Sequence, residues 1–361
     1  MADVKRRRTP LIALSVALPL IILFAVTELK YLPAYLYDVL DRSCPEQYRG
    51  PAARQPFLVV GHRGAAAEEV ENTLRSYRRA LEVDSVNGLE LDLCMTKDGV
   101  IVIWHDWDPD SPIALAREAG LEPDVKFRPL LPATGSSWRR PVHTLTLAEL
   151  RAHYGFSLKE GDTMRSVPAT IPTLDEFLAF ASRYDRLRLV YFDLKIPEEQ
   201  AAMTATYFNS IRKSLEAYTP RFTVVFMTPH QKIFDQIEQI YPGDNITFDV
   251  EPPAGIVLEP WELNSVRTAI ARGNGYASTV HPKASTWAPW TTLKRLVEND
   301  VRMRDEHNRT NPTAPIKAVV AATITAPESI RCLIATGVDG LITDDPKRLR
   351  EIAREMGRVV D

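Results

Sequence analysis

Two histidines and three carboxylic acids stand at or near the ends of apolar, strand-like runs in this 361-residue chain. They are His62, Glu90, Asp92, His105 and Asp193. Successive side chains of a strand alternate between its faces, so Glu90 and Asp92 project to the same side. Imidazoles exchange protons near neutral pH, and neighbouring carboxylates must share a cation or keep one member protonated. The residue types therefore predict acid–base chemistry beside a cation.

Glu90, Asp92 and Asp193 form a candidate metal site. Three carboxylates offer the hard oxygen ligands that Mg²⁺ and Ca²⁺ prefer, and nothing in the sequence separates the two ions. A thiolate site is excluded because the three cysteines of the chain lack metal-ligand spacing. The alternative is a purely structural network in which the acids pair with Arg63 and Lys195.

The elements that must position these residues follow from Pro56 onward, where strand-like runs alternate with helical patterns. The expected strands are 57–62, 88–94, 188–195, 222–228, 245–251, 276–281, 316–325 and 339–344, with an extra strand at 100–106. Most are continuously apolar, as parallel strands covered on both faces are. We expect an α/β fold, a (β/α)₈ TIM barrel, although a doubly wound open sheet would show the same alternation.

A barrel places its chemistry at the carboxyl ends of the strands. The histidines and acids meet this requirement, and Glu251 and His281 end two further expected strands. Cys94 lies in a strand pattern and Cys332 in a helical one, so both are expected to be buried packing residues.

Five short motifs occur in one order along the chain: HRG at 62–64, ENT at 71–73, ELD at 90–92, HD at 105–106 and GVDGLITDDP at 337–346. Together they resemble the glycerophosphodiester phosphodiesterase family. The resemblance implies a TIM barrel that uses a divalent metal to cleave glycerophosphodiesters into glycerol 3-phosphate and an alcohol.

The resemblance also implies residue roles. His62 and His105 would form the acid–base pair, with the glycerol 2-hydroxyl or a water as nucleophile. Arg63 and Lys195 would hold the phosphate oxygens. The residues expected in or around the pocket are Glu71, Asn72, Glu251 and His281. Asn72 is equally suited to be the N-cap of the following helix.

One position departs from the family pattern, because Asp193 stands where the phosphodiesterases usually have Glu. The triplet Asp193-Leu194-Lys195 also resembles the sphingomyelinase D and related phospholipase D toxins. A lysophospholipase D-like enzyme acting on lysophospholipids or sphingolipids, with a cyclic phosphate product, is therefore the alternative. A catalytically inactive, membrane-tethered binding module is a second alternative, which the completeness of the site set disfavours.

The N-terminus differs from the rest of the chain. Four basic residues, 5–8, precede an uncharged apolar run over 11–26. This pattern predicts a basic cytoplasmic tip and transmembrane anchor over 1–32, with the catalytic domain outside the cytoplasm. A cleaved signal peptide and a secreted enzyme are the alternative.

We divide the remainder into a juxtamembrane segment and linker over 33–55 and a catalytic domain over 56–361, with an insertion at about 107–145 over the site. The expected partners are a glycerophosphodiester or lysophospholipid substrate and, through the N-terminal helix, a membrane. The net charge of −3 gives no support to nucleic-acid binding.

Overall fold

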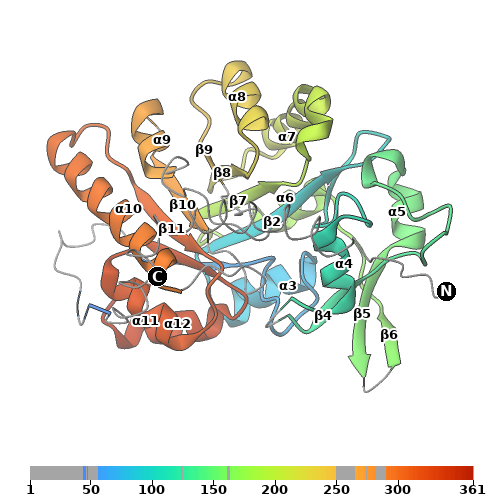
Figure 1. Ribbon diagram of the computed structural model, residues 1–361, viewed down its shortest axis with the longest axis horizontal. Helices are drawn as coiled ribbons and strands as arrows, with labels where there is room; N and C mark the ends of the chain where they lie inside the picture. Colours follow the sequence, from blue (N-terminus) through green and yellow to red (C-terminus); the bar gives the residue numbers. More distant parts are fainter. Residues whose placement is uncertain are drawn as a thin grey trace, which may run out of the picture. The chain divides into compact units, whose positions relative to one another are not determined.

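The computed structural model describes residues 44–45, 47, 56–122, 125–160, 163–248, 265–273, 275–280 and 290–360. Within this part of the chain, eight parallel strands follow one another in the order β10-β11-β12-β1-β2-β7-β8-β9 (Figure 1). They are β1 (Leu58–Gly61), β2 (Gly88–Met95), β7 (Leu189–Leu194), β8 (Thr223–Thr228), β9 (Ile246–Phe248), β10 (Tyr276–Val280), β11 (Ala318–Ala322) and β12 (Gly340–Thr343). All eight lie where the apolar runs predicted them.

Contacts between the first and last strands of this path decide between a barrel and an open sheet. The backbone N–H of Ser278 on β10 donates to Thr247 Oγ1 on β9 at 3.1 Å, and the Ser278 hydroxyl donates to the Phe248 carbonyl at 2.9 Å. The two ends of the path therefore lie side by side. The sheet is a nearly closed eight-stranded parallel barrel, which fits the predicted TIM barrel and not the doubly wound alternative.

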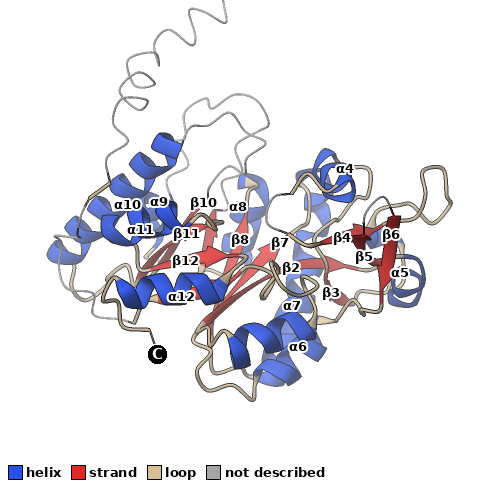
Figure 2. Cartoon of the chain, turned by 90° about the horizontal axis from the view of Figure 1, so that it is seen from below, coloured by secondary structure: helices blue, strands red, loops and turns tan. Residues whose placement is uncertain are grey.

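Helices follow the strands in alternation and surround them (Figure 2). They are α3 (Leu74–Arg78), η1 (Arg79–Val83), α6 (Leu174–Ala181), η3 (Glu198–Met203), α7 (Thr204–Tyr218), α8 (Gln231–Ile240), α9 (Ser265–Arg272), α10 (Trp290–Thr310), α11 (Pro327–Thr336) and α12 (Pro346–Glu355). The predicted extra strand is β3 (Ile101–Ile103), which pairs antiparallel with β2. It ends two residues before His105 and so carries that side chain toward the strand ends.

An excursion leaves the barrel between β3 and α6. It contains α4 (Pro112–Ala119), β4 (Phe127–Leu130), η2 (Val142–Thr144), α5 (Leu147–His153), β5 (Gly155–Glu160) and β6 (Thr163–Val167). The strands β4, β5 and β6 form a small antiparallel sheet of their own, which the sequence did not predict. The first three elements fall within the expected insertion at about 107–145, and the last three follow it.

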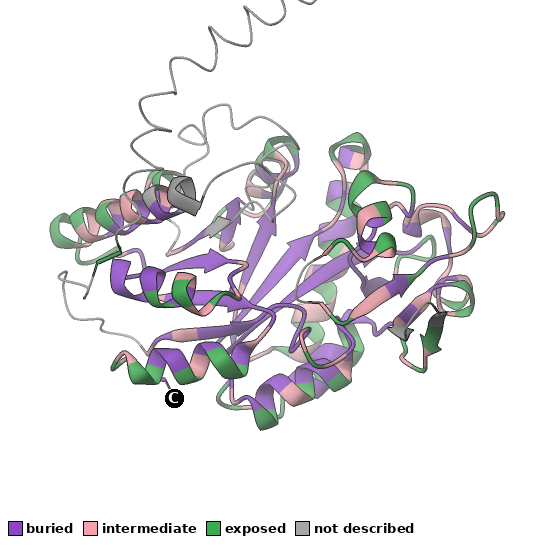
Figure 3. Ribbon diagram, turned by 60° about the horizontal axis from the view of Figure 1, so that its bottom comes forward, coloured by how far each residue is buried: buried purple, intermediate pink, exposed green. Residues whose placement is uncertain are grey.

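Alternation along the strands fills the barrel with apolar side chains. Leu189 and Tyr191 on β7, Val225 and Met227 on β8, and Val60 on β1 belong to one buried cluster. Figure 3 shows these central strands as the buried part of the molecule. Because side chains repeat every second residue, the next inward positions after Tyr191 and Val60 are Asp193 and His62. The same alternation that builds the core therefore places polar side chains at the carboxyl ends of the strands.

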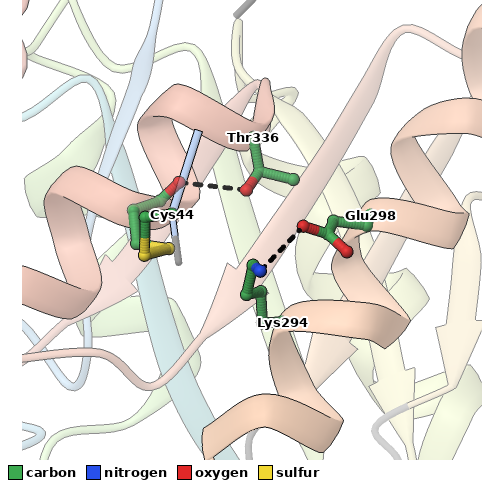
Figure 4. The surroundings of a disulfide bond; sticks show 5 residues. Cys44, Lys294, Glu298 and Thr336 are labelled. Carbon is green, nitrogen blue, oxygen red and sulfur yellow. Dashed lines mark hydrogen bonds and ion pairs between the residues drawn. A yellow bond between two sulfur atoms is a disulfide. The ribbon is translucent and has the colours of Figure 1, made fainter. Parts of the chain in front are cut away.

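A disulfide joins Cys44 to Cys332 on α11, with a Cα–Cα distance of 5.2 Å (Figure 4). Beside it, Thr336 donates a hydrogen bond to the Cys332 carbonyl at 3.0 Å. The expectation that Cys332 only packs was wrong, because its sulfur is bonded across 288 residues of sequence. Cys94 is buried and free, as predicted.

The prediction of a single-pass membrane protein needs correction. No helix among the described residues is long and apolar enough to cross a membrane. The predicted anchor over 1–32 lies outside the described residues, as does almost all of the linker over 33–55. We therefore withdraw the membrane location and the membrane as a partner through that segment.

Asp84, at the end of η1, provides a stability test that is independent of function. Its side chain is 2% exposed, and the nearest cation, Arg79 Nε, lies 3.8 Å away. Burial raises the pKa of Asp84 from 3.8 to about 6. The folded protein therefore holds this proton more tightly than the unfolded chain, so the contribution of Asp84 to stability falls as the pH rises through this range.

We expect Asp84→Asn to raise the free energy of unfolding by about 1–2 kcal/mol at about pH 8 and to have little effect at about pH 4. Urea unfolding of both proteins at the two pH values measures the difference. An equal difference at both pH values would show that the charge of Asp84 is not its cause.

Candidate active site

The candidate residues converge at the carboxyl ends of neighbouring strands. Glu90 and Asp92 lie on β2, and Asp193 lies on β7 in direct register with Asp92. His62 follows β1, which pairs with the other edge of β2. All four side chains are buried, with exposed fractions of 7% or less. The predicted acids and His62 are therefore brought together by the sheet itself.

The three acids can present one oxygen each to a common point. Those oxygens lie within 4.8 Å of one another. Burial and the charges of Asp92 and Asp193 raise the pKa of Glu90 well above its usual value. Burial opposes ionisation of Asp92 too, but Lys195 and Arg63 outweigh it and hold its pKa well below the usual range. Buried acids in this arrangement form a strongly cation-attracting site, and their oxygens suit Mg²⁺ or Ca²⁺.

Two cations border the acids. Lys195 Nζ lies 3.0 Å from Asp92 Oδ1 and 2.5 Å from Asp193 Oδ2. Arg63 Nε lies 2.9 Å from Asp92 Oδ2, and its backbone N–H donates to Glu90 Oε2 at 2.9 Å. The ion pairs that the sequence offered as an alternative to a metal are thus present. They involve the same oxygens, so a metal ion and these cations share one cluster.

Each histidine is held by a carboxylate. His62 Nδ1 lies 2.6 Å from Asp344 Oδ1, just after β12. His105 Nδ1 lies 2.7 Å from Asp106 Oδ1. The other ring nitrogen of His62 lies 3.9 Å from Glu90 Oε2 and so faces the acids. A carboxylate on Nδ1 fixes the orientation of the ring, which suits a group that exchanges protons.

Further charged residues lie around the three acids and their two cations. They include residues that the sequence did not single out for the site. Arg63 Nη1 donates to Glu71 at 2.8 Å and to Glu122 at 3.0 Å. Arg117, on α4, donates through Nε to Asp106 at 3.0 Å and also bonds Glu71 and Glu122. The excursion thus supplies two charged groups, Arg117 and Glu122, next to the predicted site.

Asn72 lies in the site and not at the helix start. Its Nδ2 donates to Asp92 Oδ2 at 2.6 Å, and its Oδ1 accepts from the Tyr77 hydroxyl at 2.8 Å. The N-cap of α3 is Thr73, whose side chain accepts from the Ser76 N–H. The N-cap interpretation of Asn72 was therefore wrong, and the pocket interpretation agrees with the geometry.

Two predicted pocket residues, Glu251 and His281, lie outside the described residues. Of the residues missed, Asp106 is part of the HD motif at 105–106, and Asp344 is part of the GVDGLITDDP motif at 337–346. Arg117 and Glu122 gave no such signal, since they occur in an excursion with ordinary charge spacing.

Comparisons with known proteins point to one family. The model of the "Glycerophosphoryl diester phosphodiesterase family" matches residues 62–251, which is more than half of the chain. A glycerophosphodiester phosphodiesterase of Caldanaerobacter subterraneus is 24% identical over 300 residues, covering 83% of this chain and 99% of that protein. Mouse glycerophosphodiester phosphodiesterase domain-containing protein 4 is 29% identical over 165 residues, 43% of this chain and only 24% of that protein.

Solved structures share the fold. A protein of Silicibacter pomeroyi assigned as a glycerophosphoryl diester phosphodiesterase superposes with a TM-score of 0.62 at 22% identity. The match covers 87% of this chain and 97% of that one. At this identity the likeness supports the barrel architecture, and the family model supplies the stronger evidence of kinship.

Proposed function

The chain belongs to the glycerophosphoryl diester phosphodiesterase family, and from that premise we propose that it hydrolyses glycerophosphodiesters to glycerol 3-phosphate and an alcohol. The observation that carries the proposal is a buried acidic cluster that is bordered by cations and faced by His62, together with a second histidine, His105, that a carboxylate also holds. A phosphodiester needs these groups: proton donors and acceptors, and positive charge for its oxygens.

Glu90, Asp92 and Asp193 would hold Mg²⁺ or Ca²⁺ through one oxygen each. A divalent cation bound there supplies a Lewis acid that polarises a phosphoryl oxygen. Lys195 and Arg63 both contact Asp92. If the acids bound a metal ion instead, these two cations would be available to bind the remaining phosphate oxygens. Charge would then be balanced within the cluster.

The histidines act as a pair in this proposal. One takes a proton from the attacking glycerol 2-hydroxyl or water, and the other donates a proton to the departing alkoxide oxygen. Attack by the 2-hydroxyl gives a cyclic phosphate, which a water molecule must then open, with the two proton-transfer roles exchanged, to give glycerol 3-phosphate. Asp344 and Asp106 stabilise the imidazolium that forms on each ring and keep Nδ1 occupied. Arg117 orients Asp106 from the excursion, and Asn72 orients Asp92. The kinetics of the single variants His62→Ala and His105→Ala will show which histidine is the acid and which is the base.

We assign the catalytic domain to residues 56–361 and place the insertion at about 107–145 over the site, because Arg117 and Glu122 reach the charges around Arg63. Glu71 accepts from both arginines, so its role is to hold Arg63 and Arg117 together and not to bind the metal.

Product analysis tests the proposal. Incubation of the full chain with glycerophosphocholine and a divalent cation, followed by ³¹P NMR, should yield glycerol 3-phosphate. A cyclic phosphate accumulating as the final product, or turnover of lysophosphatidylcholine alone, would favour the sphingomyelinase D-like alternative. Absence of turnover on every diester would favour the inactive binding module.

A further inference from the structure

Helix α4 carries two charged residues, and both are paired with partners elsewhere in the fold. Arg117 is 4% exposed and bonds Asp106 and Glu71 at the candidate site. The side chain of Glu118 is 36% exposed and accepts from the buried Arg139 at 3.0 Å. These are the only two charged residues among the eight of α4. Most of the exposed surface of the helix therefore belongs to its uncharged residues.

The exposed uncharged residues of α4 are apolar. Ile113 and Leu115 are 48% and 45% exposed, and Pro112 and Ala119 are exposed as well. At 100° per residue, these four positions fall on one side of the helix, opposite the buried Ala114 and Arg117. An exposed helix normally shows water its polar face, so this arrangement is the reverse of the usual one.

Two further exposed apolar side chains lie close to α4 in the chain or in the fold. Leu121, directly after the helix, is 74% exposed, and Leu130 on β4 is 37% exposed. β4 lies beside α4 (Figures 1 and 2). Four of the seven large apolar side chains that are exposed in the described part of the chain belong to this short region. We call Ile113, Leu115, Leu121 and Leu130 the α4 face.

Basic residues flank the α4 face. Lys126 is exposed and lies over the ring of Phe127, with Nζ 5.8 Å from its centroid. Arg128 donates to the carbonyl of Ala119, the last residue of α4, at 3.1 Å. Apolar side chains bordered by Lys and Arg complement a lipid surface, whose interior is apolar and whose head groups carry negative phosphates.

We propose that the α4 face docks on an anionic lipid surface and presents glycerophosphodiesters held in that surface to the site behind the helix. The proposal rests on the proposed function for the substrate and on the α4 face for the docking. Arg117, on the inner side of the same helix, bonds the Asp106 that holds His105. The α4 face and Arg117, which reaches the candidate site, thus lie on opposite sides of one short helix.

A local probe tests the docking in the full chain. A single polarity-sensitive fluorophore can be attached at Leu121→Cys, because Cys94 is buried and the other two cysteines form a disulfide. We expect its emission to shift to the blue when vesicles of phosphatidylcholine and phosphatidylglycerol in equal amounts are added. The matched control is Ile240→Cys, an exposed apolar position at the end of α8. A shift at 240 alone, at both positions equally, or at neither would overturn the proposal.

Kinetics separate docking from catalysis. We expect Leu115→Ser/Leu121→Ser to lower the rate on lysophosphatidylcholine held in those vesicles by about tenfold. Its rate on soluble glycerophosphocholine should equal that of wild type, and Val83→Ser/Ile240→Ser should match wild type on both. Equal loss on both substrates, or no loss on either, would overturn the proposal.

The remaining outcomes are also decisive. If the wild-type chain turns over neither substrate, the proposed function fails, and the probe at position 121 still decides whether the face docks. If light scattering shows a dimer that the double serine variant abolishes, the face binds a second copy of the chain and the lipid proposal is wrong.

Discussion

His105→Ala is expected to lower kcat for release of glycerol 3-phosphate from glycerophosphocholine by about 10²–10⁴-fold, the usual contribution of a positioned acid or base. The same size of loss is expected for His62→Ala. Each imidazole is fixed by a carboxylate on Nδ1, so its loss removes a proton-transfer group that water cannot replace in the same geometry. Initial rates at saturating substrate, measured over a range of pH, give the effect.

His153→Ala is the matched control, since that ring stacks on Trp138 in the excursion, with 4.1 Å between the centroids. It should keep wild-type kcat. Unchanged activity in both site variants would refute the assignment of the histidine pair. Loss in one variant alone would leave a single acid–base group and would require a different source for the second proton.

Asp193→Asn is expected to weaken binding of Mg²⁺ or Ca²⁺ by at least about 100-fold and to lower activity correspondingly. The change removes one negative oxygen ligand and keeps the size of the side chain. It also removes the charge that pairs with Lys195 at this position and leaves the ion pair of Lys195 with Asp92 in place. Isothermal titration of each cation into wild type and variant measures the affinity without depending on turnover.

Glu351→Gln, an exposed change on α12, serves as the control and should leave affinity and rate unchanged. Equal cation affinity in wild type and Asp193→Asn would contradict the three-acid site. Reduced activity with unchanged affinity would instead assign Asp193 to the positioning of Lys195.

The barrel could be predicted because each of its strands is recognisable from its local sequence. Parallel strands buried on both faces are continuously apolar, and the eight predicted runs each overlap an observed strand. The site followed from the same rule, because side chains at strand ends meet when the strands pair in register. Asp92 and Asp193 are 101 residues apart in sequence and directly paired in the sheet.

Other features depend on tertiary contacts that no local pattern encodes. Arg117 and Glu122 lie in an excursion whose path back to Arg63 is set by the packing of α4. Asn72 was compatible with an N-cap, but its left-handed backbone, with φ of 54°, turns its amide toward Asp92. The Cys44–Cys332 disulfide joins two points that only the folded chain brings together.

Release of glycerol 3-phosphate from glycerophosphocholine by chelator-treated protein, before and after Mg²⁺ or Ca²⁺ is added back, tests the central claim most directly. Metal-assisted hydrolysis at Glu90, Asp92 and Asp193 predicts that chelation abolishes the release and that at least one of the two cations restores it. Full activity in chelator, or no glycerol 3-phosphate with either cation, would contradict it.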